Sequence, residues 1–106
     1  MPKFMISVVR DRNSLITIDD GMMDEIDKLN DDMVNAGIRL FVGGLRPIGE
    51  AEVVPCEGDG RGTKEAAAFL DGFWVVDCAT IDEARSWAQM ASRACRSNIE
   101  IRQFYD

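Results

Sequence analysis

Hydrophobic residues recur with two different periods along the chain, and each change of period marks a new element. Residues 3–9 alternate two sets of side chains, many of them β-branched, and this pattern predicts a strand. Residues 20–36 place apolar side chains at steps of four and three, which is one face of a helix. Asp19 or Asp20 can cap that helix, and Gly37 supplies the left-handed residue that ends it.

A second strand is predicted directly after this helix, over residues 38–43. Its alternation puts Ile38, Leu40 and Val42 on one face, and Arg39 and Phe41 on the other. Before the helix, the apolar residues 15–18 either extend the first strand or form a hydrophobic lead-in, and the pattern leaves both readings open.

The stretch from Phe69 to Asp77 is the segment around which the chain is organised. Its residues 73–76 are apolar on both faces, as a central strand that is covered on both sides requires. Thr80 and Glu83 have the spacing of a capping box, so a helix is expected to begin at once. The apolar stripe of that helix continues to Cys95.

Weaker signals fill the remaining segments. Residues 51–56 predict a short extended piece that Pro55 confines to a sheet edge or a side hairpin. A glycine-rich loop over residues 59–62 follows, and residues 63–70 favour about two turns of helix. Residues 98–105 predict a last strand, with Ile99 and Ile101 facing opposite to Glu100, Arg102 and Phe104.

The resulting order is strand, helix, strand, inserted hairpin, strand, helix, strand. Right-handed crossovers then give a ferredoxin-like α+β sandwich, βαββαβ, formed by one domain over residues 1–106. Both helices would cover one face of the sheet and leave the other face open and partly apolar. We therefore expect a homodimer that buries the open face.

Composition limits the function. The chain has 106 residues, a net charge of -7 and no histidine. The negative charge argues against nucleic acid, and no segment is apolar enough for a membrane or a signal peptide, so a cytoplasmic protein is expected. Without histidine the usual zinc sites and every His-based catalytic triad are excluded, so no metal or cofactor is expected.

Several blocks spread along the chain resemble the YCII-related, or DGPF, family. The blocks are Leu29-Asn30 to Ala36-Gly37, Gly44-Leu45-Arg46-Pro47, Asp59-Gly60, Asp71-Gly72-Phe73-Trp74, Ile81 to Trp87 and Ile99-Glu100-Ile101-Arg102-Gln103. The resemblance implies the dimeric α+β barrel of small bacterial proteins. A few members act as lyases or isomerases on small aromatic or chlorinated acids, and some are associated with transcription factors.

Two departures from the family affect the expected chemistry. The histidine and aspartate that form a catalytic dyad in the founding branch cannot be carried over, since this chain has no histidine. In addition, Arg61-Gly62 follows Asp59-Gly60 where the family has proline and phenylalanine. The pocket is therefore expected to be remodelled.

Charged residues on strands and in loops are the candidates for binding and catalysis. A cleft that holds a small organic anion would use guanidinium groups for the carboxylate and aromatic side chains for the apolar body. The residues proposed for this cleft are Arg39, Arg46, Trp74, Glu100, Arg102 and Phe104. The alternative is that these charges form an ordinary solvated sheet face.

A carboxylate is the natural proton carrier in a chain without histidine, and Asp59 and Glu65 are the candidate catalytic bases. The alternative is that Asp59 belongs to a turn and that Glu65 supports a helix. Cys78 precedes a helix cap and is a possible nucleophile, although free cysteines are mostly buried and inert. The expected function is proton transfer on a small anionic metabolite by a lyase, isomerase or cyclase, and the alternative is a non-catalytic ligand-binding or protein-interaction module.

Overall fold

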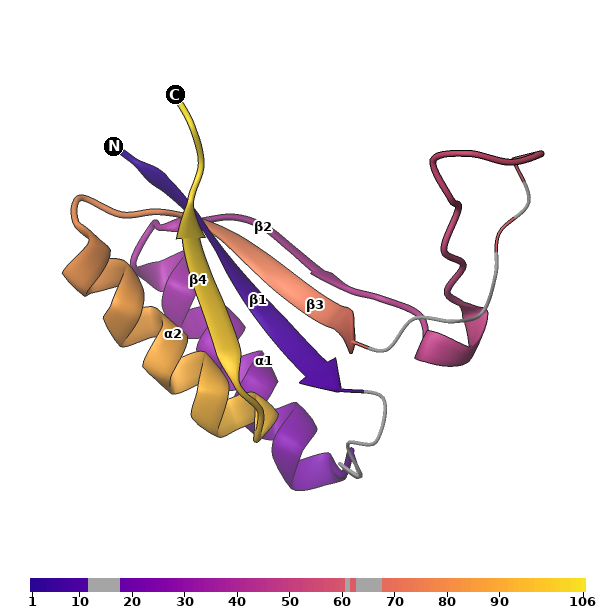
Figure 1. The fold of residues 1–106 in the computed structure, drawn as a ribbon. Helices are drawn as coiled ribbons and strands as arrows, with labels where there is room; N and C mark the ends of the chain where they lie inside the picture. Colours follow the sequence, from indigo (N-terminus) through magenta and orange to yellow (C-terminus); the bar gives the residue numbers. More distant parts are fainter. Residues whose placement is uncertain (12–17, 61, 63–67) are drawn as a thin grey trace.

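The computed structural model describes residues 1–11, 18–60, 62 and 68–106, which form an α+β sandwich (Figure 1). The elements follow in the order β1 (Lys3–Asp11), α1 (Asp20–Asn35), β2 (Arg39–Gly44), the short 3-10 helix η1 (Ile48–Glu50), β3 (Ala68–Asp77), α2 (Ile81–Cys95) and β4 (Ile99–Gln103).

The four strands form one antiparallel sheet in the order β2-β3-β1-β4. Both helices lie on the same face of this sheet, and the two chain ends lie near each other at one end of it (Figure 1). The two strand–helix–strand units that the sequence predicts therefore interleave, and the ferredoxin-like fold is confirmed.

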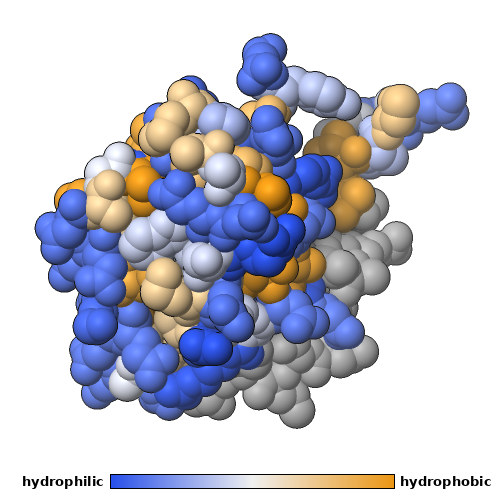
Figure 2. Space-filling model, turned by 90° about the vertical axis from the view of Figure 1, so that its left-hand side faces the viewer, coloured by the Kyte–Doolittle hydropathy of each residue, from blue (hydrophilic) through white to orange (hydrophobic). Residues whose placement is uncertain are grey.

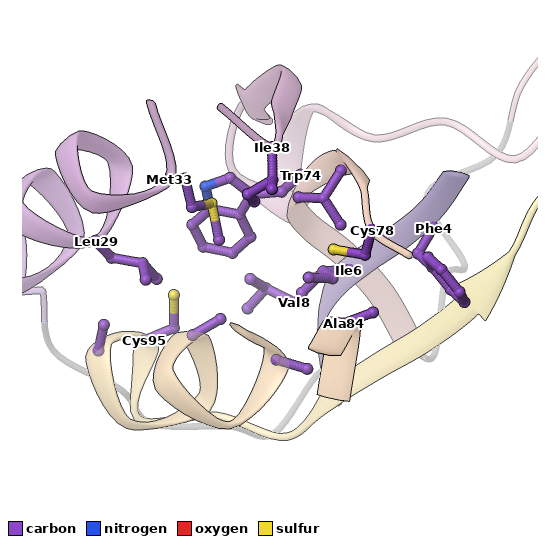
Figure 3. Close-up of a cluster of buried hydrophobic side chains, with 14 of the residues drawn as sticks. Phe4, Ile6, Val8, Leu29, Met33, Ile38, Trp74, Cys78, Ala84 and Cys95 are labelled. Atoms are coloured by element: carbon purple, nitrogen blue, oxygen red, sulfur yellow. The ribbon is translucent and has the colours of Figure 1, made fainter. Parts of the chain in front are cut away.

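The core fills the space between the sheet and the helices. Strand β1 contributes Phe4, Ile6 and Val8, whose exposed fractions are 4% or less. Figure 3 shows Trp74 close to Met33 and Ile38, with Cys95 pointing from α2 into the interior. Small alanines on α2 allow that helix to approach the sheet, so the apolar stripe of the sequence is the buried face.

Side chains cap both helices where the sequence predicts caps. The carboxylate of Asp19 accepts a hydrogen bond of 2.8 Å from the amide of Met22. The Thr80 hydroxyl accepts from the amide of Glu83 at 3.2 Å, while the Glu83 carboxylate reaches back to the amide of Ala79. These bonds satisfy amides that would otherwise lack a partner in the first turn of each helix.

The central strand β3 is buried on one face only. Trp74 and Val76 face the helices and are buried, whereas Phe73 and Val75 lie half-buried on the open face. The prediction that this strand is covered on both sides is therefore not met by the chain alone, because both helices pack on the same face.

The segment before β3 also differs from the prediction. Residues 68–70 belong to the strand rather than to a helix, because they continue the pairing with β1, while residues 63–67 lie outside the described part. Within residues 51–56, Ala51 has extended backbone and Val53 is a bridge position, without a full strand. Of the apolar residues 15–18, only Ile18 is described, so the choice between strand and lead-in stays open.

Candidate functional site

The open face of the sheet is built by alternate residues of neighbouring strands. Met5 pairs with Arg102, and Ser7 pairs with Glu100, so these four side chains share one face. Val9 pairs with Leu70 on the other side of β1. Because Phe4, Ile6 and Val8 face the core, the alternation of β1 directs Met5, Ser7 and Val9 away from the helices.

A hollow of about 580 Å³ lies on this open face. It is lined by Met5, Ser7, Val9, Leu70, Glu100, Arg102, Gln103, Phe104 and Tyr105. Most of the wall is apolar, and the charges lie together on β4. Such a surface, with a few convergent polar groups beside apolar side chains, is typical of small-molecule sites.

Arg102 and Glu100 form the charged part of the hollow. The Arg102 Nε donates to Glu100 Oε1 at 2.9 Å, and the Arg102 Nη2 donates to the same oxygen. The Arg102 side chain is 76% exposed. An exposed ion pair of this kind contributes little to stability, so its donors can be redirected to a ligand at small cost.

Phe104 lies with these charges, but Trp74 and Arg39 do not. Trp74 is 3% exposed on the helix side, where its Nε1 donates to Asn30 Oδ1 at 2.8 Å. Arg39 donates to the same oxygen at 3.4 Å. These two residues thus belong to the opposite side of the sheet.

A bulge in β2 explains the position of Arg39. The pairing with β3 shifts between Arg39 and Phe41, so that Arg39 is opposite Val76 and Phe41 is opposite Val75. An inserted residue reverses the alternation that follows it. Arg39 therefore lies on the helix side while Phe41 stacks on Phe73 on the open face, and the prediction that Arg39 and Phe41 share a face is wrong.

The remaining predicted residues lie apart from the hollow. Arg46 follows β2 and pairs with Glu50 at 3.0 Å. Asp59 lies in the exposed segment 51–60, which extends away from the sheet in Figure 1. Glu65 lies outside the described residues. Of the proposed cleft, the structure therefore brings together Glu100, Arg102 and Phe104.

Tyr105, Met5 and Leu70 line the hollow but were absent from the predicted site. The alternation of residues 3–9 already placed Met5 opposite the core side chains, so this signal was present in the sequence. Leu70 was missed because a helix was expected there. Tyr105 lay within the predicted strand 98–105, but β4 ends at Gln103, so the alternation does not extend to Tyr105.

Nucleophilic chemistry by Cys78 is disfavoured. Burial raises the pKa of its thiol to about 11, and the negative charges of Glu83 and Asp77 add to that effect. The thiolate is the reactive form, so a buried thiol with a raised pKa is inert at neutral pH. The inert alternative considered from the sequence thus agrees with the structure.

Much of the surface is polar, and Figure 2 shows a face on which hydrophobic residues form only small separate groups. Within the described ranges, no three potential metal ligands of the His, Cys, Asp or Glu type come together. The helices in the same ranges are also too short or too polar to cross a membrane.

Fold and site together define a small α+β sandwich of the ferredoxin-like type, whose uncovered sheet face carries a hollow with an arginine and aromatic side chains. The family model of the YCII-related domain matches residues 3–106, and the chain belongs to that family. The resemblance seen in the sequence blocks is thereby confirmed. Comparison with curated proteins gives no match.

Proposed function

We propose that this YCII-related protein binds a small organic anion with an aromatic or apolar body at the open face of the sheet and moves a proton on it. The reaction class is that of a lyase, isomerase or cyclase without a cofactor. The observation that supports the proposal best is the exposed guanidinium of Arg102 beside the apolar wall of the hollow.

Arg102 is suited to a carboxylate. Two of its five N–H groups donate to one oxygen of Glu100. A guanidinium holds a carboxylate by two parallel hydrogen bonds, and a ligand carboxylate can take over donors that Glu100 now uses. Met5, Leu70 and Phe104 would then cover the body of the ligand.

A homodimer is part of the proposal. Val9, Phe41 and Phe104 are exposed on or beside the open face, with exposed fractions of 37%, 57% and 44%. A second copy packed on this face would bury them and would close the hollow from water, which strengthens the ion pair with a ligand. Light scattering at micromolar concentration tests this: a dimeric mass is expected, and a monomeric mass contradicts it.

Asp59 and Glu65 remain the predicted bases for the proton transfer. Segment 51–60 extends beyond the sheet (Figure 1). Asp59 can therefore act on a ligand in the hollow only if this segment folds over the hollow of its own chain or reaches the hollow of the second copy. Once a substrate is known, Asp59→Asn and Glu65→Gln each test the assignment. A turnover that neither substitution slows would remove both residues from the mechanism.

Binding is tested first with simple anions. Benzoate, phenylacetate and salicylate are expected to raise the melting temperature, because a ligand that binds only the folded state stabilises it. Arg102→Gln should abolish the rise. The control is Arg85→Gln, which removes an exposed arginine of α2 that pairs with Asp82 away from the hollow. Equal responses of the two variants would contradict a role for Arg102.

The second candidate is a non-catalytic binding module that uses the same face. It is favoured by the ion pair itself, since the Glu100 carboxylate already accepts two hydrogen bonds from Arg102 and is therefore less available to take a proton from a ligand. Native mass spectrometry of protein purified gently from its host reports both assembly state and retained molecules. A retained molecule that is released unchanged after incubation indicates binding, and a converted one indicates catalysis.

A further inference from the structure

A second pocket lies on the helix side of the sheet, separate from the hollow on the open face. It has a volume of about 140 Å³ and lies between the first turns of α1 and the adjoining ends of β1, β2 and β3. Apolar side chains, including Val8, Met22 and Ile26, form most of its wall. Gly44 and Gly72 lie opposite each other in the sheet and leave its rim open.

The polar part of this pocket is the ion pair between Arg10 and Asp71. Arg10 Nε donates to Asp71 Oδ2 at 2.8 Å, and the Arg10 side chain is only 8% exposed. A bulge in β3 creates the pair: Val8 is opposite Gly72 and Val9 is opposite Leu70, so Asp71 is the inserted residue. The insertion turns Asp71 toward the helix side, where Arg10 lies.

This pair offers hydrogen bonds that the described residues do not use. Among them, no acceptor bonds the Nη groups of Arg10, although Arg10 is more than nine-tenths buried. The carboxylate of Asp71 has a second oxygen, which can also accept a hydrogen bond. By contrast, the Trp74 N–H is already donated to Asn30. Arg10 and Asp71 are thus the groups in the pocket wall that can recognise a ligand.

We propose that this pocket binds a small neutral molecule with an apolar body and a carboxamide-like group. The carbonyl oxygen accepts from Arg10 Nη, and the N–H donates to the second carboxylate oxygen of Asp71. A neutral ligand is favoured because the positive charge of Arg10 and the negative charge of Asp71 already balance each other. An anion would add an uncompensated charge inside an apolar wall, which is costly.

Size agrees with this class of ligand. A cavity of about 150 Å³ lined by apolar side chains accommodates benzene, and the pocket here is of similar volume. Benzamide, a benzene ring with one carboxamide, is therefore a suitable probe. As a fragment it is expected to bind with a dissociation constant on the order of 1 mM.

The two tryptophans provide an internal control for the experiment. Trp74 lines the pocket, and Trp87 lies on α2 outside it. In a titration with benzamide followed by ¹H–¹⁵N correlation spectra, the Trp74 indole signal should move to saturation, and the Trp87 signal should stay in place. Trp87→Phe leaves a single indole signal and assigns the two.

Variants then test the recognition group. Arg10→Gln is expected to weaken benzamide binding about tenfold or more, since it removes hydrogen bonds from a charged donor. Gly44→Val should also abolish binding by filling the rim, and the fold should tolerate it because a Cβ at Gly44 meets nothing within 4 Å. Arg102→Gln, on the other face, should leave benzamide binding unchanged.

Three results would overturn the proposal. They are a Trp74 signal that benzamide does not move, a Gly44→Val variant that binds benzamide as tightly as the unaltered protein, and benzoate that binds at Trp74 as tightly as benzamide. The last result would show that the pocket does not discriminate against anions. The proposal for the open face depends on Arg102 instead, so either proposal can be refuted while the other stands.

Discussion

Gly72 of β3 lies close to the backbone of β2, and its substitution by alanine tests that close approach. A Cβ at this position would lie 3.0 Å from the carbonyl oxygen of Gly43 and 3.4 Å from the Cα of Gly44. Both atoms belong to the backbone and cannot rotate away as a side chain can. The two strands must therefore separate by a few tenths of an ångström.

The cost follows from two opposing effects. Overpacking in a fitted site costs about 1–3 kcal/mol, whereas replacing glycine with alanine stabilises by about 0.4–1 kcal/mol through the unfolded chain. Gly44→Ala is the matched control, because Gly44 is opposite Gly72 and its Cβ would meet nothing within 4 Å. Both variants share the second effect, so their difference of about 1–3 kcal/mol measures the clash.

Urea denaturation at one fixed protein concentration measures this difference, with tryptophan fluorescence as the signal. For 106 residues the unfolding entropy is about 0.22 kcal/mol/K. Gly72→Ala should therefore melt roughly 5–13 °C below Gly44→Ala. If the two variants agree within about 0.5 kcal/mol, the strands are not held at this distance and the reasoning fails.

Three further predictions concern the caps and the thiols. Thr80→Ala should lower the free energy of unfolding by about 1 kcal/mol, since it removes the cap of α2, and Thr80→Ser should restore it; an unchanged stability in Thr80→Ala would contradict the cap. The pKa of Asp19 is lowered mainly by the amide that it caps, so its stabilising effect is present above about pH 4 and is lost as pH falls through the lowered pKa. The stability difference between the unaltered protein and Asp19→Asn should shrink on acidification, and a constant difference would be inconsistent with this linkage. Burial raises the pKa of Cys78 and Cys95 to about 11. A thiol reagent at about pH 8 should therefore modify the exposed Cys56 at once and the other two cysteines only in urea. Rapid modification of all three cysteines without urea would contradict the burial of Cys78 and Cys95.

The elements themselves could be predicted from the sequence, because their signals are local. The period of Met22 to Met33 defines α1, and the Thr80 cap defines the start of α2. Their order along the chain then leaves few topologies, of which the ferredoxin-like fold is the one observed. Glu100 and Arg102 could be placed on one face for the same reason, since β4 alternates without interruption.

Two bulges were decided only by tertiary structure. In β2 a bulge turns Arg39 away from Phe41, and in β3 another turns Asp71 toward Arg10, sixty-one residues away in the chain. The sequence by itself determined the strands and helices, their order and the alternation within regular strands. It could not determine the side of the sheet for residues next to a bulge, because a bulge forms where a strand fits its partner, and that fit exists only once the strands are paired.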